Sequence, residues 1–86
     1  MKQFSYTITD PLGIHARPAG QLAKLAKSFG ETVVTITKDD KTAKASQLMK
    51  LMSLGVKGGD TITIACEGGD EDAALEALSS FLKENL

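Results

Sequence analysis

The chain has 86 residues and a formal net charge of −1 at pH 7, with 42% hydrophobic and 24% charged residues. This length predicts a single domain over residues 1–86, and the near-neutral charge excludes a global field that would recruit nucleic acid or an anionic membrane. The single cysteine excludes an internal disulfide, and no apolar run is long enough for a membrane span or a signal peptide. We therefore expect a cytoplasmic domain that does not insert into a membrane.

The first third of the chain predicts a strand, a turn and a helix. Apolar residues alternate with serine and threonine over residues 4–9, which is the period of a strand with one buried face, and residues 10–13 have turn chemistry. Over residues 16–29 the apolar side chains follow helical spacing, and Gly30 suits the C-terminal cap of this helix. The opposite stripe of the helix is basic and polar, and it comprises Arg17, Gln21, Lys24 and Lys27.

The rest of the chain predicts three strands and two helices. Residues 33–37 are rich in β-branched side chains, residues 38–41 read as a hairpin turn, and residues 42–45 form a weaker returning strand. A short helix follows, which Ser46 can cap and Gly55 ends. Residues 61–66 form the clearest strand, with Cys66 on its inward face as a structural thiol. Asp70 can cap the last helix.

The element order is β-α-β-β-α-β-α, which predicts a two-layer α+β domain with four strands in one sheet and the helices on a single face.

The only histidine lies at the start of the first predicted helix, in the stretch Gly-Ile-His-Ala-Arg-Pro-Ala of residues 13–19. Pro18 is tolerated in the first turn of a helix, because the N–H it lacks would have no intrahelical partner there. His15 therefore lies beside unpaired amides and the positive end of the helix dipole, with the cation of Arg17 two residues away. Ala16 is small and leaves the ring accessible. We hypothesise that His15 carries a phosphoryl group; a surface histidine without a role is the alternative.

Other chemistries fit the sequence less well. One histidine and one distant cysteine do not make a metal-ligand set, so we expect neither a metal nor a cofactor. No serine–histidine–acid set can be placed, which disfavours nucleophilic hydrolysis. The glycine pairs at residues 58–59 and 68–69 lack the spacing or the lysine of a nucleotide-binding loop, so we predict turns there.

The short helix carries more apolar side chains than it can bury: Leu48, Met49, Leu51 and Met52. At least one of them should stay exposed. An exposed methionine or leucine beside a basic helix face suits docking of several partners, and a slightly apolar surface without a role is the alternative.

The stretch around His15 resembles the active-site motif of the histidine-containing phosphocarrier (HPr) family of the bacterial sugar phosphotransferase system. The resemblance covers essentially the whole chain, including residues 51–55, the strand of residues 61–66 and the acidic start of the last helix. It implies an open-faced β-sandwich, with a four-stranded antiparallel sheet under three helices, and a monomer.

The resemblance also implies a function. Enzyme I, charged by phosphoenolpyruvate, would phosphorylate the δ nitrogen of His15, Arg17 would help to hold the phosphate, and IIA domains of sugar permeases would accept it. The protein would be a stoichiometric carrier rather than an enzyme. The docking residues implied by the family are Ala16, Arg17, Gly20, Gln21, Lys24, Lys27, Leu48, Met49 and Met52, with Pro18 supporting the motif.

One position departs from the family pattern. In Gram-positive members and many others, a serine directly precedes two apolar residues at the start of the second helix, and its ATP-dependent phosphorylation regulates carbon catabolism. In such members the partners include a serine kinase and a transcriptional regulator. Here Gln47 precedes Leu48 and Met49, and Ser46 falls one place earlier, which one extra residue near positions 30–31 explains. Ser46 is either a regulatory site or only a helix cap.

Two further functions are open to a chain of this pattern. The first is a regulatory binding module of the same fold that works through protein contacts, and the presence of His15 argues against it. The second is a small phosphatase, which would need an anion loop with arginine and asparagine. The only asparagine is Asn85, near the end of the chain.

Overall fold

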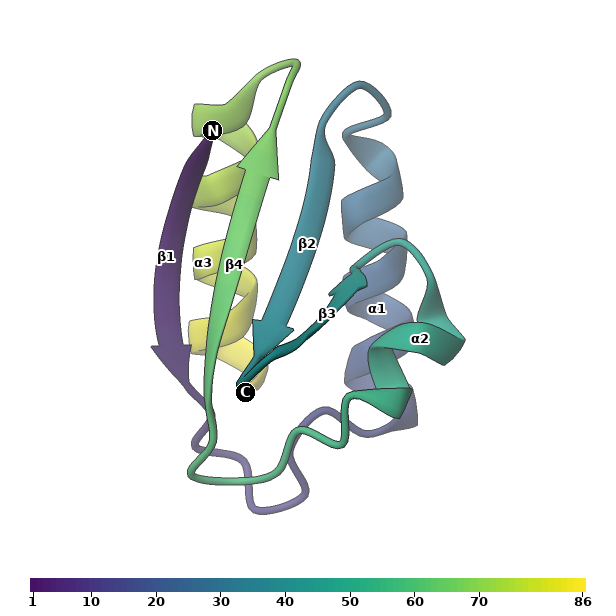
Figure 1. Ribbon diagram of the computed structural model, residues 1–86, viewed down its shortest axis with the longest axis vertical. Helices are drawn as coiled ribbons and strands as arrows, with labels where there is room; N and C mark the ends of the chain where they lie inside the picture. The colour runs from purple at the N-terminus through teal and green to yellow at the C-terminus, as the bar shows by residue number, and fades with distance from the viewer.

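The computed structural model describes residues 1–86 as four strands and three helices in the predicted order β-α-β-β-α-β-α. The elements are β1 (Lys2–Thr7), α1 (Ala16–Ser28), β2 (Val33–Lys38), β3 (Lys41–Lys44), α2 (Leu48–Ser53), β4 (Thr61–Glu67) and α3 (Glu71–Asn85). The strands form one antiparallel sheet in the order β1-β4-β2-β3. Figure 1 shows α1 and α3 on the same side of this sheet and α2 beside α1, close to the β3 edge. The predicted open-faced α+β architecture is confirmed.

The central strand β4 anchors the core because its alternate side chains are fully buried. Ile62, Ile64 and Cys66 have exposed fractions of 0%, 1% and 0%. Ile64 lies opposite Phe4 of β1 on one side and opposite Ile36 of β2 on the other. Cross-strand apolar pairs of this kind stabilise a sheet face that packs on helices. The predicted inward face of this strand, including the buried Cys66 thiol, is confirmed.

The opposite face of the sheet is uncovered and carries hydroxyl side chains. Pairs of them face each other across neighbouring strands, with Oγ–Oγ1 or Oγ1–Oγ1 distances of 3.4 Å for Ser5–Thr63, 2.9 Å for Thr7–Thr61 and 2.9 Å for Thr37–Thr42. Threonine combines a β-branched side chain with a group that hydrogen-bonds across the strands, so it suits a solvated sheet face. Because this face of the sheet is polar, it can stay in contact with water and needs no second layer of helices to cover it.

The helices turn their apolar stripes toward the sheet. The buried residues of α1 are Pro18, Ala19, Leu22, Ala23 and Ala26, and those of α3 are Ala74, Leu78 and Leu82. The short helix α2 contributes one fully buried side chain, Leu51. No helix is long and apolar enough to cross a membrane. The predicted helical faces are therefore the ones that form the core.

The helix caps predicted at Asp70, Gly30 and Ser46 can be compared with the structure. The Asp70 cap of α3 is confirmed, because its carboxylate accepts a hydrogen bond from the Ala73 amide at 3.1 Å. Gly30 lies directly after the C-cap of α1, Phe29, which is the usual place of a capping glycine, but it does not have the positive φ of such a cap. A Cβ at Gly30 would meet no atom within 4 Å, so neither packing nor a positive φ requires glycine there.

The cap predicted at Ser46 is wrong, because Gln47 is the N-cap of α2. Ala45 still pairs with β2 through its amide, which donates to the Val34 carbonyl at 2.9 Å. The Gln47 amide then donates to the Lys44 carbonyl at 3.0 Å, which closes a turn around Ser46. This turn delays the start of the helix to Leu48, and Ser46 lies outside it.

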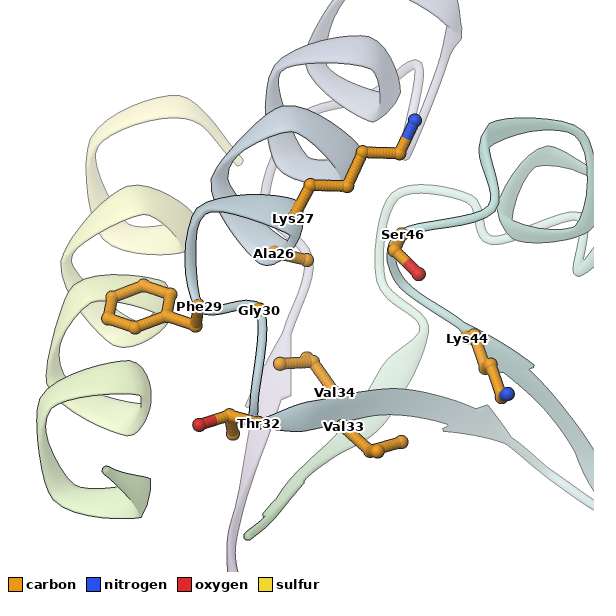
Figure 2. Close-up of a pocket in the computed structure, with 9 residues that line it drawn as sticks. All are labelled: Ala26, Lys27, Phe29, Gly30, Thr32, Val33, Val34, Lys44 and Ser46. Atoms are coloured by element: carbon orange, nitrogen blue, oxygen red, sulfur yellow. The ribbon is translucent and has the colours of Figure 1, made fainter. Parts of the chain in front are cut away.

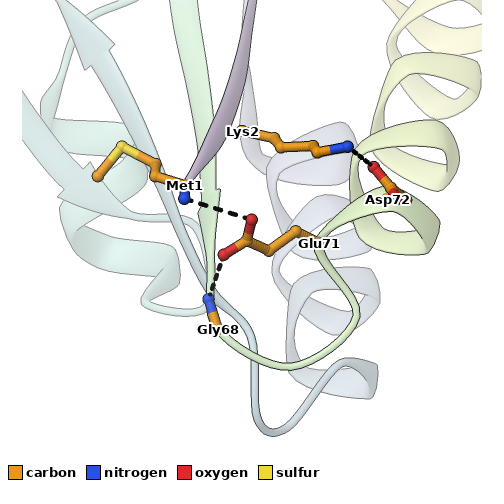
Figure 3. A network of polar contacts seen from close by, with 5 residues as sticks. All are labelled: Met1, Lys2, Gly68, Glu71 and Asp72. Atoms are coloured by element: carbon orange, nitrogen blue, oxygen red, sulfur yellow. Dashed lines mark hydrogen bonds and ion pairs between the residues drawn. The ribbon is translucent and has the colours of Figure 1, made fainter.

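Charged contacts join the first residues of the chain to the start of α3 (Figure 3). The carboxylate of Glu71 accepts from the Gly68 amide at 2.8 Å and lies 3.3 Å from the amino group of Met1. The Gly68 hydrogen bond, together with the Met1 ammonium, lowers the pKa of the Glu71 carboxyl. Lys2 pairs with Asp72. These contacts hold one end of β1 against α3.

Candidate functional site

His15 is the N-cap residue of α1, and its place at a helix start is as predicted. Its backbone is extended, with φ −97° and ψ −178°, and its carbonyl accepts the Ala19 amide at 2.9 Å. The side chain makes no capping hydrogen bond and is 39% exposed. Because the backbone alone begins the helix, the imidazole ring is free for chemistry and open to a partner.

The first turn of α1 offers donors for an anion. The amides of Ala16 and Arg17 make no hydrogen bond within the protein, and Pro18 has no N–H. Arg17 is exposed and none of the four ion pairs of the protein includes it. Unpaired amides at the positive end of a helix dipole attract negative charge, and a guanidinium adds bidentate donors for phosphate. His15 and Arg17 thus both lie at the start of α1, and their role as a phosphate site stays a prediction.

Asp10 lies beside the His15 ring, and the sequence did not single it out. One carboxylate oxygen, Oδ2, lies 3.8 Å from Nε2 of His15, and the other, Oδ1, accepts the Leu12 amide at 2.9 Å. The Asp10 carbonyl accepts the Gly13 amide at 2.9 Å, which closes the predicted turn. The signal in the sequence was an aspartate at the first position of a turn that leads to a histidine. That signal predicts the turn but not the direction of the carboxylate.

The loop that carries His15 packs against the loop of residues 54–60. The Ile14 amide donates to the Val56 carbonyl at 3.2 Å, and the Gly59 amide donates to the Ile8 carbonyl at 2.8 Å. Gly13 has φ +67°, and a Cβ built there would lie 2.1 Å from the Val56 carbonyl oxygen. Only glycine fits this close approach of two backbones, so the two loops act as one support for His15.

An ion pair also fixes the loop of residues 54–60, which packs against the loop that carries His15. Lys38, at the end of β2, lies 3.0 Å from the Asp60 carboxylate and donates to the Gly55 carbonyl at 2.9 Å. Asp60 Oδ2 also accepts the Lys57 amide at 2.8 Å. The Lys57 amide and the Lys38 ammonium lower the pKa of the Asp60 carboxyl. This network ties the loop beside His15 to the sheet.

The residues implied as a docking face lie on the helices α1 and α2, which are adjacent (Figure 1). On α2, Met49 is 78% exposed, and Leu48 and Met52 are each 38% exposed, which agrees with the expectation that the short helix cannot bury all its apolar side chains. On α1, Gln21, Lys24 and Lys27 are exposed and Gly20 is half-buried. Leu12, which the sequence did not single out, is 70% exposed in the loop before His15.

Ser46 lies in a different place from the histidine site. It lines a pocket of about 250 Å³ together with Ala26, Lys27, Phe29, Gly30, Thr32, Val33, Val34 and Lys44. Figure 2 shows that the side chains of Lys27 and Lys44 point in different directions around it. Neither His15 nor Arg17 lines this pocket. A role of Ser46 in regulation stays a prediction.

Known proteins resemble this chain over nearly all of its length. The family described as "PTS HPr component phosphorylation site" matches residues 2–84. The phosphocarrier protein HPr of Lysinibacillus sphaericus is 43% identical over 84 residues, which cover 98% of this chain and 94% of that protein. A solved structure of a mycoplasma histidine-containing phosphocarrier protein is 37% identical, with a TM-score of 0.92, and the match covers 96% of this chain and 93% of the other.

A solved HPr dimer from Thermoanaerobacter tengcongensis is 34% identical, with a TM-score of 0.76, and the match covers 98% of this chain and 95% of the other. Identity above one third, coverage of more than nine tenths of each chain and a shared fold agree with the motif around His15. The chain therefore belongs to the HPr family, the phosphocarrier proteins of the phosphotransferase system.

Proposed function

We propose that His15 accepts a phosphoryl group from phosphorylated enzyme I and passes it to IIA domains of sugar permeases. The observation that carries this proposal is the position of a half-exposed imidazole at the N-cap of α1, beside two unpaired amides and an unpaired Arg17. The protein then acts as a stoichiometric carrier and not as an enzyme that turns over a small molecule.

The transfer step needs a nucleophilic nitrogen and donors for the phosphoryl oxygens. The lone pair of Nδ1 forms the N–P bond while the bond from phosphorus to its donor breaks, and the same step in reverse delivers the group to the acceptor. Nδ1 is the nitrogen that we assign to this role because Nε2 faces the Asp10 carboxylate. The amides of Ala16 and Arg17 and the Arg17 guanidinium stabilise charge on the phosphoryl oxygens, which is the main demand of phosphoryl transfer.

The surroundings of His15 suit a macromolecular partner better than a small substrate. The protein has two pockets, and His15 lines neither of them. We place partner docking on Gly20, Gln21, Lys24 and Lys27 of α1 and on Leu48, Met49 and Met52 of α2. Neither helix carries an acidic side chain. A partner with acidic side chains around an apolar centre is complementary to this surface.

We further propose that the carrier works as a monomer in the cytoplasm, where phosphorylated enzyme I and the IIA domains reach it. The apolar faces of the sheet and of the two long helices are covered within one chain, and the open sheet face is polar. An assembly is therefore not needed to complete the core. The dimeric relative from Thermoanaerobacter tengcongensis shares the fold, and its dimer is a property of that protein.

The direct test is incubation of the purified protein with enzyme I and phosphoenolpyruvate, followed by intact mass measurement. We expect the mass of one added phosphate, and we expect the group to be lost in acid, as is typical of a P–N bond. Adding a IIA domain should return the protein to its original mass and transfer the phosphate. The absence of any mass increase with active enzyme I would contradict the proposed function.

Replacing Arg17 with alanine should slow the uptake of phosphate by about tenfold to a hundredfold, because a hydrogen bond to a charged group contributes ~1.5–3 kcal/mol. The fold should be unchanged, since Arg17 makes no ion pair and is exposed. Rapid-quench kinetics measure the rate, and circular dichroism measures the fold. Lys41→Ala, at the exposed start of β3, removes a cation of the same charge as a control. An unfolded Arg17→Ala protein would show that Arg17 has a structural role.

A further inference from the structure

We propose that Asp10 is a positioning residue for phosphoryl transfer. Its carboxylate attracts Nε2–H of the His15 ring, favours the neutral form of the ring whose lone pair is on Nδ1, and offsets the positive charge that the ring gains when Nδ1 bonds to phosphorus. This inference rests on the proposed function and adds to it a residue outside the motif of residues 13–19.

The two oxygens of the Asp10 carboxylate have different surroundings. Oδ1 accepts the Leu12 amide at 2.9 Å, so its position is set by the turn. Oδ2 lies 3.8 Å from Nε2 of His15. Both side chains are partly exposed, with exposed fractions of 39% for His15 and 27% for Asp10. The turn therefore presents one oxygen to the ring while the other closes the loop.

The backbone of Asp10 is held from three sides. Its amide donates to the Leu86 carbonyl at 3.0 Å, and its carbonyl accepts the Gly13 amide at 2.9 Å. On the third side, a Cβ at Gly58 would lie 2.8 Å from the Asp10 carbonyl oxygen, so the neighbouring loop is in close contact. The Leu86 carbonyl also accepts from the amide and the hydroxyl of Thr9, at 2.7 and 2.8 Å. A carboxylate on a backbone fixed in this way keeps its direction.

A carboxylate near one ring nitrogen selects the form of the ring. A neutral imidazole has one N–H, and an acceptor beside Nε2 favours the form with the proton on Nε2 and the lone pair on Nδ1. The separation of 3.8 Å is too long for a formed hydrogen bond and short enough for electrostatic attraction. Contacts of this kind tighten when the reacting complex forms.

The carboxylate also matches the charge that transfer creates. The Nδ1 lone pair forms the N–P bond, the electron pair of the breaking bond leaves with the donor, and the proton stays on Nε2. The ring then carries positive charge next to Oδ2. Within the ring Cε1 separates the two nitrogens, so the phosphoryl oxygens lie farther from the carboxylate than Nε2 does. The positive charge on the ring is therefore the charge nearest to the carboxylate, and the unpaired amides and the Arg17 guanidinium offset the charge of the phosphoryl oxygens.

The test compares Asp10→Asn with Asp40→Asn. The first keeps an oxygen for the Leu12 amide and removes the charge beside His15, while the second removes the same charge from the exposed hairpin turn. We expect the rate of phosphate uptake from enzyme I to fall about threefold in Asp10→Asn, because exposed ion pairs have modest strength. We also expect nitrogen-15 NMR of the free protein to show a smaller share of the Nε2–H form. Asp40→Asn should match the native protein in both measurements.

Each outcome decides the proposal. If Asp10→Asn takes up phosphate at the native rate, Asp10 does not position the ring for transfer. If the rate falls and the NMR signature of the ring is unchanged, the effect is structural and the proposal is overturned as well. If the native protein takes up no phosphate, the proposed function fails, and the NMR comparison of the free proteins still shows whether Asp10 sets the form of the ring.

Discussion

His15→Ala is expected to take up no phosphate at all from phosphorylated enzyme I, while it remains folded. The chain has no other histidine, so no second imidazole can replace it. The helix start should survive, because it depends on the His15 carbonyl, which the Ala19 amide contacts, and not on the ring. We expect the free energy of unfolding to change by ~0.5 kcal/mol or less, as is usual for exposed positions.

Intact mass measurement after reaction gives the result directly, and denaturant unfolding gives the stability. Gln3→Ala is the control, because Gln3 is exposed on β1, carries no nucleophile and is not one of the proposed docking residues. It should take up one phosphate like the native chain. An acid-labile phosphate on His15→Ala would place the phosphoryl group on another residue and would contradict the assignment.

The position of His15 and Arg17 could be predicted from the sequence because local rules determine it. Proline in a first turn and apolar residues at helical spacing place a helix start within a residue, and a helix start brings its own amides and dipole. Neither effect depends on distant parts of the chain. The same holds for β4, where strict alternation from Thr61 to Cys66 predicts the inward face.

The features that the sequence did not predict, the position of the Asp10 carboxylate and the start of α2, depend on contacts between distant segments and on turn geometry. The direction of the Asp10 carboxylate follows from a turn that is braced by the loop of residues 54–60 and by Leu86. Serine has a high preference for an N-cap, which is the reason that Ser46 was predicted as one. The turn closed by Gln47 and Lys44 continues the β2–β3 pairing and moves the start of α2 to Leu48. This turn competes with a helix start at Ser46, and the preferences of the local residues do not show which of the two forms.

The position of Ser46 relative to the start of α2 bears on the comparison with the family pattern. Gln47, and not Ser46, is the residue directly before the helix. The one-residue offset from the family pattern, which the sequence suggests, stays a prediction. The extra residue placed near positions 30–31 stays a prediction.

Gly13→Ala is expected to destabilise the protein by ~3–5 kcal/mol, a large part of the ~4–13 kcal/mol expected for a chain of this size. Two effects add. Alanine at φ +67° adopts a left-handed conformation that costs ~1–2 kcal/mol. The new Cβ also meets backbone, at 2.1 Å from the Val56 oxygen and 2.5 Å from Lys57 Cα, and backbone cannot rotate away as a side chain can.

Gly55→Ala separates the two effects. Gly55 also has φ +67°, but a Cβ there would meet no atom within 4 Å, so only the conformational cost of ~1–2 kcal/mol should appear. Guanidinium unfolding measures the free energy of unfolding of both variants. The difference between their losses is the cost of separating the loop that carries His15 from the loop of residues 54–60. Equal losses in both variants would show that the loops separate without cost. A larger loss in Gly13→Ala, joined by slower phosphate uptake in the folded fraction, would mean that this contact holds His15 in place, since Val56 also accepts the Ile14 amide next to it.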